Sequence, residues 1–201
     1  MKKAFALLLA LSLLLAMVPA SAANYVSVGS TVYFGHYEQD GRYNSKEAIP
    51  WIVLDVRGGS ALLLSQYVLD AMPWNTSTYT VQWYSCTLNS WLNYSFYNEA
   101  FSWSEQNAIN SYLSDPVFLL SYDEVRTYLS RWNLCAMPTR YAMNRGVYVS
   151  GSYSWWWTRT VGSRENQTWG VNTSGVLNEF HMRKESGGIR PAIWVSISAL
   201  P

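Results

Sequence analysis

Two segments in the last third of the chain constrain its fold more than any other feature. Residues 155–159 read Trp-Trp-Trp-Thr-Arg, and residues 187–195 read Gly-Gly-Ile-Arg-Pro-Ala-Ile-Trp-Val. In an extended strand, Trp155 and Trp157 face one side of a sheet and Trp156 faces the other. At least one of these two faces must belong to a protein core. We therefore predict that all three tryptophans are structural and that the Gly-Gly-x-Arg-Pro turn leads into an apolar strand.

The N-terminus has the organisation of a secretory signal peptide. Two lysines at positions 2 and 3 precede an apolar run over residues 4–18, and residues 19–22 read Pro-Ala-Ser-Ala, a small-residue cleavage site. The run is shorter than the roughly 20 apolar residues that a spanning helix needs. We predict that residues 1–22 are removed and that residues 23–201 form a single secreted domain of bacterial origin, with no membrane span after cleavage.

The charge balance excludes nucleic acid as the expected partner. The chain has 14 basic and 13 acidic residues, and loss of the two signal-peptide lysines leaves 12 against 13. Nucleic-acid binding needs a basic stripe that displaces counterions from phosphate, and the sequence contains none. Aromatic residues make up 16% of the chain, so we expect some of them to remain at the surface, where they suit ligand binding.

The hydrophobic patterns predict strands first, then helices, then strands again, which is typical of an α+β fold rather than an alternating α/β fold. A first strand is expected at 31–37, and strands at 50–56 and 61–65 form a hairpin. Capping residues and apolar spacing predict the starts of four helices, at Thr87, Ser102, Ser121 and Thr139. Strands at 169–171 and 176–180 flank a hairpin loop at 172–175.

The two cysteines, Cys86 and Cys135, are 49 positions apart and leave two alternatives open. A disulfide between them would stabilise the fold by at most about 4 kcal/mol through loop entropy; otherwise they are two separate thiols. Cys86 also precedes a predicted helix N-terminus, where the helix dipole lowers the pKa of a thiol. With His36 or His181 as base, Cys86 could serve as the nucleophile of a secreted cysteine hydrolase.

No other catalytic pattern occurs. The sequence lacks a Gly-x-Ser-x-Gly elbow, a Ser-x-x-Lys pair, a His-Glu-x-x-His helix and a phosphate-binding loop. Its two histidines lack the spacing of metal ligands. We therefore predict a protein that is not an enzyme and that uses neither a metal nor a cofactor.

Motifs in a fixed order extend over nearly the whole mature chain. Besides the two C-terminal segments, they are Val32-x-Phe34-Gly35-x-Tyr37-Glu38-Gln39-Asp40, Pro50-Trp51-x-Val53-Leu54-Asp55-Val56, Ala61-Leu62-Leu63-Leu64-Ser65, Cys86-Thr87-Leu88-x-x-Trp91-Leu92-Asn93-x-x-Phe96-Tyr97, Val117-Phe118-Leu119-Leu120-Ser121-x-Asp123-Glu124-Val125 and Pro138-Thr139-x-Tyr141-Ala142. With these motifs the chain resembles a domain-of-unknown-function family of exported proteins from gram-positive, often gut, bacteria. Its relatives usually read Trp-Trp-Trp-Leu-Arg-Ser, whereas this chain has Thr158 and Thr160.

That family in turn is similar to the C-type lectin-like fold. The resemblance implies small antiparallel sheets, two or more helices and an irregular C-terminal half that carries the binding face. Calcium-dependent lectins of this fold use Trp-Asn-Asp motifs, but the tripeptides at 74–76 and 132–134 lack the acidic third residue. Sulfatase-modifying enzymes of the fold need C-terminal cysteines, and none follows Cys135.

These observations favour an extracellular, non-enzymatic binding or adhesion module that recognises a glycan, a peptide or a protein surface. The alternatives are the cysteine hydrolase and a structural component of the cell envelope. In the predicted site, the exposed ring of Trp169 and the polar turn with Asn172, Thr173 and Ser174 form the rim. Two arginines, Arg159 and Arg190, fix the strands beneath it.

Overall fold

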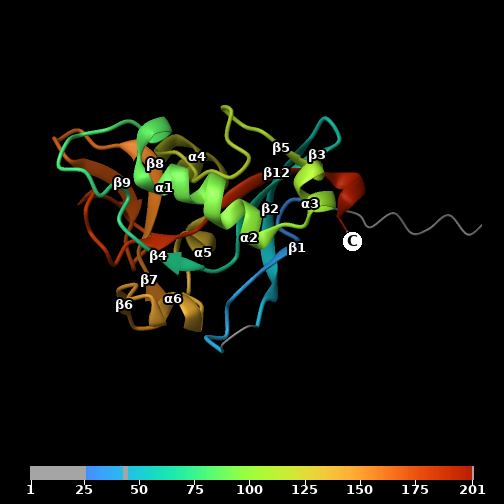
Figure 1. The fold of residues 1–201 in the computed structure, drawn as a ribbon, viewed down its shortest axis with the longest axis horizontal. Helices are drawn as coiled ribbons and strands as arrows, with labels where there is room; N and C mark the ends of the chain where they lie inside the picture. Colours follow the sequence, from blue (N-terminus) through green and yellow to red (C-terminus); the bar gives the residue numbers. More distant parts are fainter. Residues whose placement is uncertain (1–25, 43–44, 201) are drawn as a thin grey trace, which may run out of the picture.

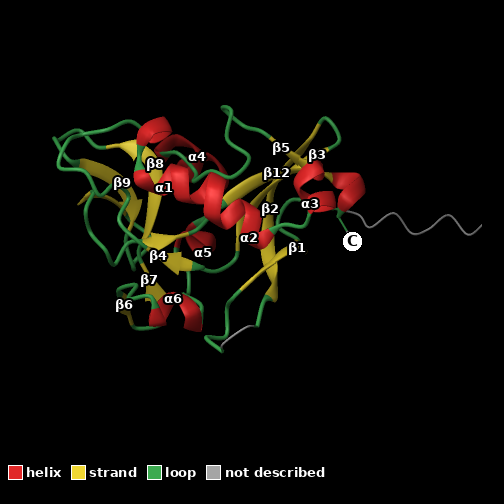
Figure 2. Ribbon diagram, in the orientation of Figure 1, coloured by secondary structure: helices red, strands yellow, loops and turns green. Residues whose placement is uncertain are grey.

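The computed structural model describes residues 26–42 and 45–200. Within these residues the chain forms two curled five-stranded sheets and one two-stranded sheet, with short helices packed around them (Figure 1). The strands come first, then most of the helices, then strands again (Figure 2). The predicted α+β class is confirmed, whereas the C-type lectin-like arrangement stays a prediction. The predicted signal peptide lies outside the described residues.

The first sheet contains both the early strands and the C-terminal strand of the chain. Its order is β1 (Thr31–Tyr37), β2 (Glu47–Arg57), β3 (Ser60–Ser65), β12 (Ala192–Ser196) and β5 (Ile109–Asn110). All neighbouring pairs are antiparallel. The predicted hairpin between β2 and β3 is present, and its turn residues Gly58 and Gly59 have φ of +55° and +76°, the left-handed values that a two-residue hairpin turn requires.

The second sheet contains the tryptophan strand. Its order is β10 (Leu177–His181), β9 (Gln167–Val171), β8 (Trp156–Val161), β11 (Gly188–Ile189) and β4 (Asp70–Ala71). Strands β9 and β10 form the hairpin predicted around residues 172–175. A separate two-stranded sheet consists of β6 (Val149–Ser150) and β7 (Tyr153–Ser154).

The Gly-Gly-x-Arg-Pro motif joins the two large sheets. Strand β11 belongs to the second sheet and β12 to the first, and only Arg190 and Pro191 lie between them. Strand β12 then runs between β3 and β5. This motif therefore sets how the two sheets meet, and Arg190 lies at their junction.

The longest helical stretch lies across the front of both sheets (Figure 1). It consists of α1 (Thr87–Trp91), a π-helical segment (Leu92–Phe96) and α2 (Tyr97–Ala100). The remaining helices are α3 (Trp103–Ala108), α4 (Tyr122–Tyr128), α5 (Arg131–Leu134), α6 (Arg140–Asn144) and the single 3-10 turns η1 (Trp83–Ser85) and η3 (Ile197–Ala199). In the described part of the chain, no helix has the length and apolar character that crossing a membrane requires.

Two of the predicted helix starts are capping boxes, and both are confirmed. In α3 the Ser102 hydroxyl accepts a hydrogen bond from the Glu105 backbone N–H, while the Glu105 carboxylate accepts one from the Ser102 N–H at 2.8 Å. Ser121 and Glu124 repeat this arrangement at the start of α4. Each box satisfies two backbone donors that the first turn of a helix leaves without partners. Thr139 caps α6 as predicted.

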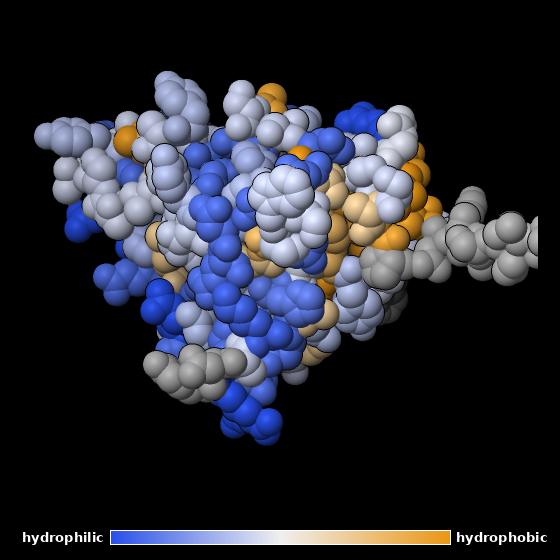
Figure 3. All heavy atoms as spheres, turned by 45° about the vertical axis from the view of Figure 1, so that its right-hand side comes forward, coloured by the Kyte–Doolittle hydropathy of each residue, from blue (hydrophilic) through white to orange (hydrophobic). Residues whose placement is uncertain are grey.

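The core has two layers, one on each face of the first sheet. Strands β3 and β12 are buried on both faces, which explains their continuous apolar sequences. Leu63 and Ile193 pack in the layer that includes the α1–α2 helix. Leu62 and Trp194 point to the opposite layer, which includes α4. The surface turned forward in Figure 3 is mostly hydrophilic, with apolar residues gathered toward the end that carries α3 and the first sheet.

Candidate functional site

The three consecutive tryptophans are all part of the core. Trp156 and Trp157 have no exposed surface, and Trp155 is 4% exposed. As the strand alternation predicted, Trp155 and Trp157 pack in one core layer and Trp156 in the other. The indole N–H of Trp156 donates to the backbone oxygen of Leu134 at 3.0 Å. All three rings are therefore structural, and of the three only Trp155 also borders a cavity in the described residues.

Arg159 is tied into the protein by an acidic partner. Its guanidinium forms an ion pair with Glu124 of α4 and lies over the rings of Tyr112 and Phe118. A further hydrogen bond reaches the backbone oxygen of Leu119 at 2.7 Å. Burial opposes ionisation of Glu124, but hydrogen bonds from Arg159 and the backbone outweigh it and lower the pKa of this carboxyl group. Arg159 is therefore satisfied inside the protein, consistent with its predicted role in fixing a strand.

Trp169 does not form the exposed rim that the sequence predicted. Its side chain is half-buried and packs edge-on against Tyr122 of α4, with 4.7 Å between ring centroids. The prediction of an exposed ring is wrong because α4, which is distant in sequence, covers this part of β9. Trp169 and Arg159 thus both contact α4.

The polar turn after β9 lies apart from Trp169. The Asn172 side-chain oxygen accepts hydrogen bonds from the N–H groups of Ser174 and Val176, both at 2.9 Å, and so fixes the turn. Asn172 and Thr173 line a small cavity of 180 Å³ together with residues of three neighbouring segments, which are Tyr148, Trp155, Phe180, Lys184 and Ser186. We call this space the turn cavity. Trp169 does not line it, so the predicted rim is divided between two places.

Arg190 is the most deeply buried charged residue of the predicted set. It is 1% exposed, its Nε donates to the Ser65 backbone oxygen at 2.9 Å, and one Nη donates to the Asn133 backbone oxygen at 2.6 Å. Its guanidinium lies 5.1 Å from the ring centroid of Trp156. Burial lowers the pKa of Arg190 to about 9, so the group still carries its positive charge at neutral pH.

Arg190 lines a cavity of 330 Å³, which we call the Arg190 cavity. The other walls come from the first sheet, from the segment after β3, from α5 and from β7. They include Ile52, Gln66, Tyr67, Asn133, Cys135 and Tyr153. The volume lies at the small end of the range of about 300–1,000 Å³ found for ligand pockets. Aromatic and amide side chains therefore surround a buried cation at the junction of the two sheets.

The two cysteines are free thiols, so of the two alternatives the structure has the unbonded one. Cys86 is buried in the core beneath α1, whereas Cys135 is half-buried beside the turn cavity and the Arg190 cavity. The Cys135 Sγ lies 3.7 Å from the backbone oxygen of Thr173. A disulfide would have to join two separate parts of the molecule.

The helix start at Cys86 differs from the prediction in two ways. Cys86 itself, rather than Thr87, is the N-cap residue, and its Sγ accepts a hydrogen bond from the Asn89 backbone N–H at 3.3 Å. Burial raises the pKa of the Cys86 thiol to about 12, although the backbone hydrogen bonds act in the opposite direction. The predicted lowering of this pKa is therefore wrong, because desolvation outweighs the helix terminus.

Neither histidine assists Cys86. His36 and His181 are both exposed, and neither imidazole forms a hydrogen bond with a cysteine in the described part of the chain. The His181 Nδ1 instead accepts a hydrogen bond from the Arg183 backbone N–H. The thiol and the imidazoles that the hydrolase alternative needs are not brought together.

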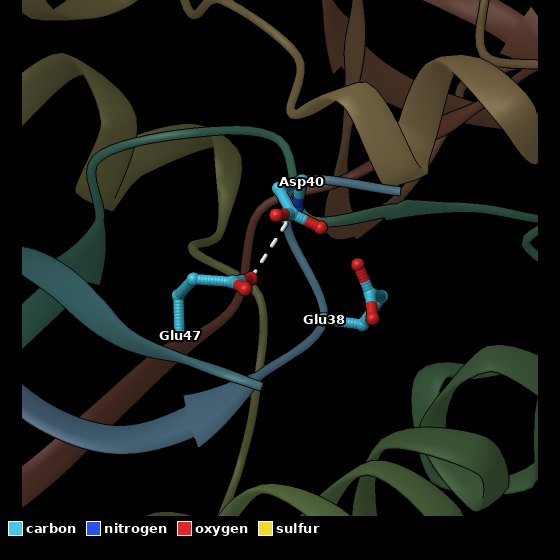
Figure 4. A group of neighbouring side chains, drawn as sticks. All are labelled: Glu38, Asp40 and Glu47. Carbon is cyan, nitrogen blue, oxygen red and sulfur yellow. Dashed lines mark hydrogen bonds between the residues drawn. The ribbon is translucent and has the colours of Figure 1, made fainter. Parts of the chain in front are cut away.

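Three carboxylates that the sequence analysis did not single out lie close together. One oxygen from each of Glu38, Asp40 and Glu47 lies within 4.8 Å of the others (Figure 4). The Glu47 carboxylate accepts hydrogen bonds from the backbone N–H groups of Gln39 and Asp40. Glu38 and Asp40 accept from backbone N–H groups that follow in the same loop. Since each carboxylate has such a backbone donor, the cluster is explained by the folding of this loop.

The Arg190 cavity is the part of the site that sequence reasoning missed. Tyr67, Asn133 and Tyr153 lie on segments far apart in the chain, and no spacing rule connects them. One signal could have pointed to the cavity. An arginine in a motif between two apolar strands must be buried, and a buried charge needs a partner.

Comparisons with known proteins agree with the family resemblance in part. The family model DUF6273, described as a domain of unknown function, matches residues 58–197, and the chain therefore belongs to this family. The match starts at the turn between β2 and β3, so β1 and most of β2 lie outside it although they are part of the same sheet. No curated protein and no solved structure matches the chain.

Proposed function

We propose that this DUF6273 member is an extracellular, non-enzymatic binding module for a glycan, a peptide or a protein surface, and that its ligand enters the Arg190 cavity. The observation that carries the proposal is the composition of this cavity. It combines a buried guanidinium with the amides of Gln66 and Asn133 and the phenol rings of Tyr67 and Tyr153. In binding pockets, polar groups that converge beside aromatic side chains fix the orientation of a ligand.

The surroundings of the cysteines support binding over hydrolysis. A thiol nucleophile must be accessible and ionised, whereas Cys86 is buried and its pKa is raised. Cys135 is accessible from the cavity, but neither histidine hydrogen-bonds it in the described part of the chain. The aromatic and amide groups around Arg190 serve recognition without a nucleophile.

Two finer points belong to the same proposal. We propose a C-type lectin-like architecture, supported by the presence of β1 and the C-terminal strand β12 in one small antiparallel sheet with helices packed on it. We also propose secretion from a gram-positive bacterium, supported by the signal-peptide pattern of residues 1–22. Mass spectrometry of the exported protein should then find Ala23 or a neighbouring residue at the N-terminus, and recovery of the intact chain from membranes would contradict secretion.

The binding test uses residues 23–201 on glycan and peptide arrays, followed by two matched variants. Tyr153→Ala removes a ring that is 42% exposed at the Arg190 cavity, and Tyr148→Ala removes a ring that is 56% exposed at the turn cavity. A ring stacked on a ligand contributes about 0.5–1.5 kcal/mol, so Tyr153→Ala should weaken binding by about two- to twelvefold.

Tyr148→Ala should leave the affinity unchanged. The reverse result, with Tyr148→Ala weakening binding and Tyr153→Ala having no effect, would move the site to the turn cavity. Absence of any ligand on both arrays would refute recognition of a glycan or a peptide.

A further inference from the structure

In the described residues, the charge of Arg190 has no carboxylate partner, and the titratable side chain that acts on it is the Cys135 thiol. All 13 Asp and Glu residues of the chain belong to the described residues, and none of them forms an ion pair with Arg190. A buried charge without a counterion is costly, because the Coulombic attraction that would offset its desolvation is missing. This cost is unusual at a residue that is 1% exposed.

Two other arginines in the described residues do pair with a carboxylate that is buried or half-buried. Arg159 pairs with Glu124, and Arg145 pairs with Asp70, whose side chain is 4% exposed. Both pairs lie outside the Arg190 cavity. Among the described residues, a carboxylate thus neutralises Arg145 and Arg159, whereas Arg190 has none and lies beside a cavity.

The hydrogen bonds of Arg190 also leave capacity for a ligand. A guanidinium has five N–H donors, and protein acceptors in the described residues take two of them, the backbone oxygens of Ser65 and Asn133. Three N–H donors have no acceptor in the described residues, and the side chain that carries them lines the cavity. The planar arrangement of these donors matches the two oxygens of a carboxylate.

We infer that the Arg190 cavity binds a ligand through a single carboxylate group, which supplies the counterion that Arg190 lacks. This inference rests on the proposed binding function and names the chemistry of its ligand. One cation matches a monoanion, since a dianion would leave a net buried negative charge. The amides of Gln66 and Asn133 and the rings of Tyr67 and Tyr153 contact the remainder of the ligand.

Both an acidic sugar and the free C-terminus of a peptide supply such a carboxylate. The test separates these two sources. The wild-type protein is titrated with glucuronate against glucose, and with N-acetylglycine against its amide. Each pair differs mainly in the carboxylate. The readouts are calorimetry and the ¹⁵N-labelled Nε–H signals of the arginines. One or both acids should bind and shift an arginine signal, and the better acid identifies the source, whereas the neutral analogues should not bind.

Two variants each add one carboxylate, the first inside the Arg190 cavity and the second outside it, and neither truncates the core. Asn133→Asp puts a carboxylate on the cavity wall beside Arg190, and should weaken acid binding about tenfold or more while keeping or raising the melting temperature. Asn144→Asp adds the same charge on the exposed end of α6, outside the Arg190 cavity, and should change neither quantity. Arg190→Lys keeps the charge but loses the planar donors, and should also weaken acid binding if this variant folds.

The outcomes separate this inference from the function on which it rests. Equal binding of acids and neutral analogues, or binding of neither while the arrays yield a ligand, would overturn the carboxylate site and leave the binding function intact. Acid binding that survives Asn133→Asp unchanged would also overturn it, because the carboxylate would then bind elsewhere. Acid binding with empty arrays would instead support the site and refute recognition of a larger ligand.

Discussion

The ion pair between Arg159 and Glu124 provides the sharpest test of how the helical segment is attached to the tryptophan sheet. Glu124 performs two tasks, because it closes the capping box of α4 and neutralises Arg159 of β8. Glu124→Gln separates these tasks. Glutamine can still accept the hydrogen bond from the Ser121 N–H in a capping box, but it leaves the guanidinium without its charge partner.

The expected loss follows from the burial of the pair. The side chains of Arg159 and Glu124 are 10% and 17% exposed, and breaking a buried pair from one side costs about 3–5 kcal/mol. Because this pair keeps some contact with water, we expect about 3 kcal/mol. For a domain of this size, that loss lowers the melting temperature by roughly 6–12 °C. Glu105→Gln is the matched control, since Glu105 occupies the same position in the α3 capping box without an arginine partner, and should cost less than about 1 kcal/mol.

The pH dependence supplies the refuting measurement. The folded-state pKa of Glu124 is lowered below its usual value of 4.5, so the unfolded state binds more protons at mildly acidic pH. The stability that Glu124 contributes is therefore present above pH 4.5 and is lost as the pH falls through the folded-state pKa. Urea unfolding of the wild type and Glu124→Gln should converge as the pH is lowered below 4.5. The two glutamine variants could lose equal amounts of unfolding free energy at pH 7, or the difference between wild type and Glu124→Gln could persist at low pH. Either result would show that the ion pair is not a source of stability.

Two further predictions concern the aromatic residues and the thiols. Trp157→Ala should lower the free energy of unfolding by about 3–5 kcal/mol because it removes a fully buried ring. Trp169→Ala should lower it less, since Trp169 is half-buried and loses mainly its contact with Tyr122. The opposite order in paired denaturant curves would contradict the assignment of buried faces. A thiol reagent should label Cys135 in the native protein and Cys86 only after unfolding, because Cys86 is fully buried. Titration of no thiol in either state would instead mean that the two cysteines are bonded.

Local patterns predicted the local structure well. The boxes at Ser102 and Ser121 depend on residues three positions apart, and both formed. The alternation of Trp155 to Trp157 assigned their faces correctly because a strand fixes alternate directions. Long-range packing was not visible in the same way. The burial of Trp169 depends on Tyr122, 47 positions earlier, and the burial of Cys86 reversed the pKa shift that its position at a helix start had suggested.

The position of β12 has a consequence for the order in which the domain can assemble. A chain emerges from the ribosome or an export channel with its N-terminus first, so the β1–β3 meander appears long before β12. Until then one edge of β3, which is apolar along most of its length, has no strand beside it, and such an edge invites pairing with other chains. The sheet closes only when residues 192–196 arrive. The first sheet can therefore form completely only after residues 192–196 have been synthesised or exported. Chains truncated before β12 should aggregate rather than fold into a smaller domain.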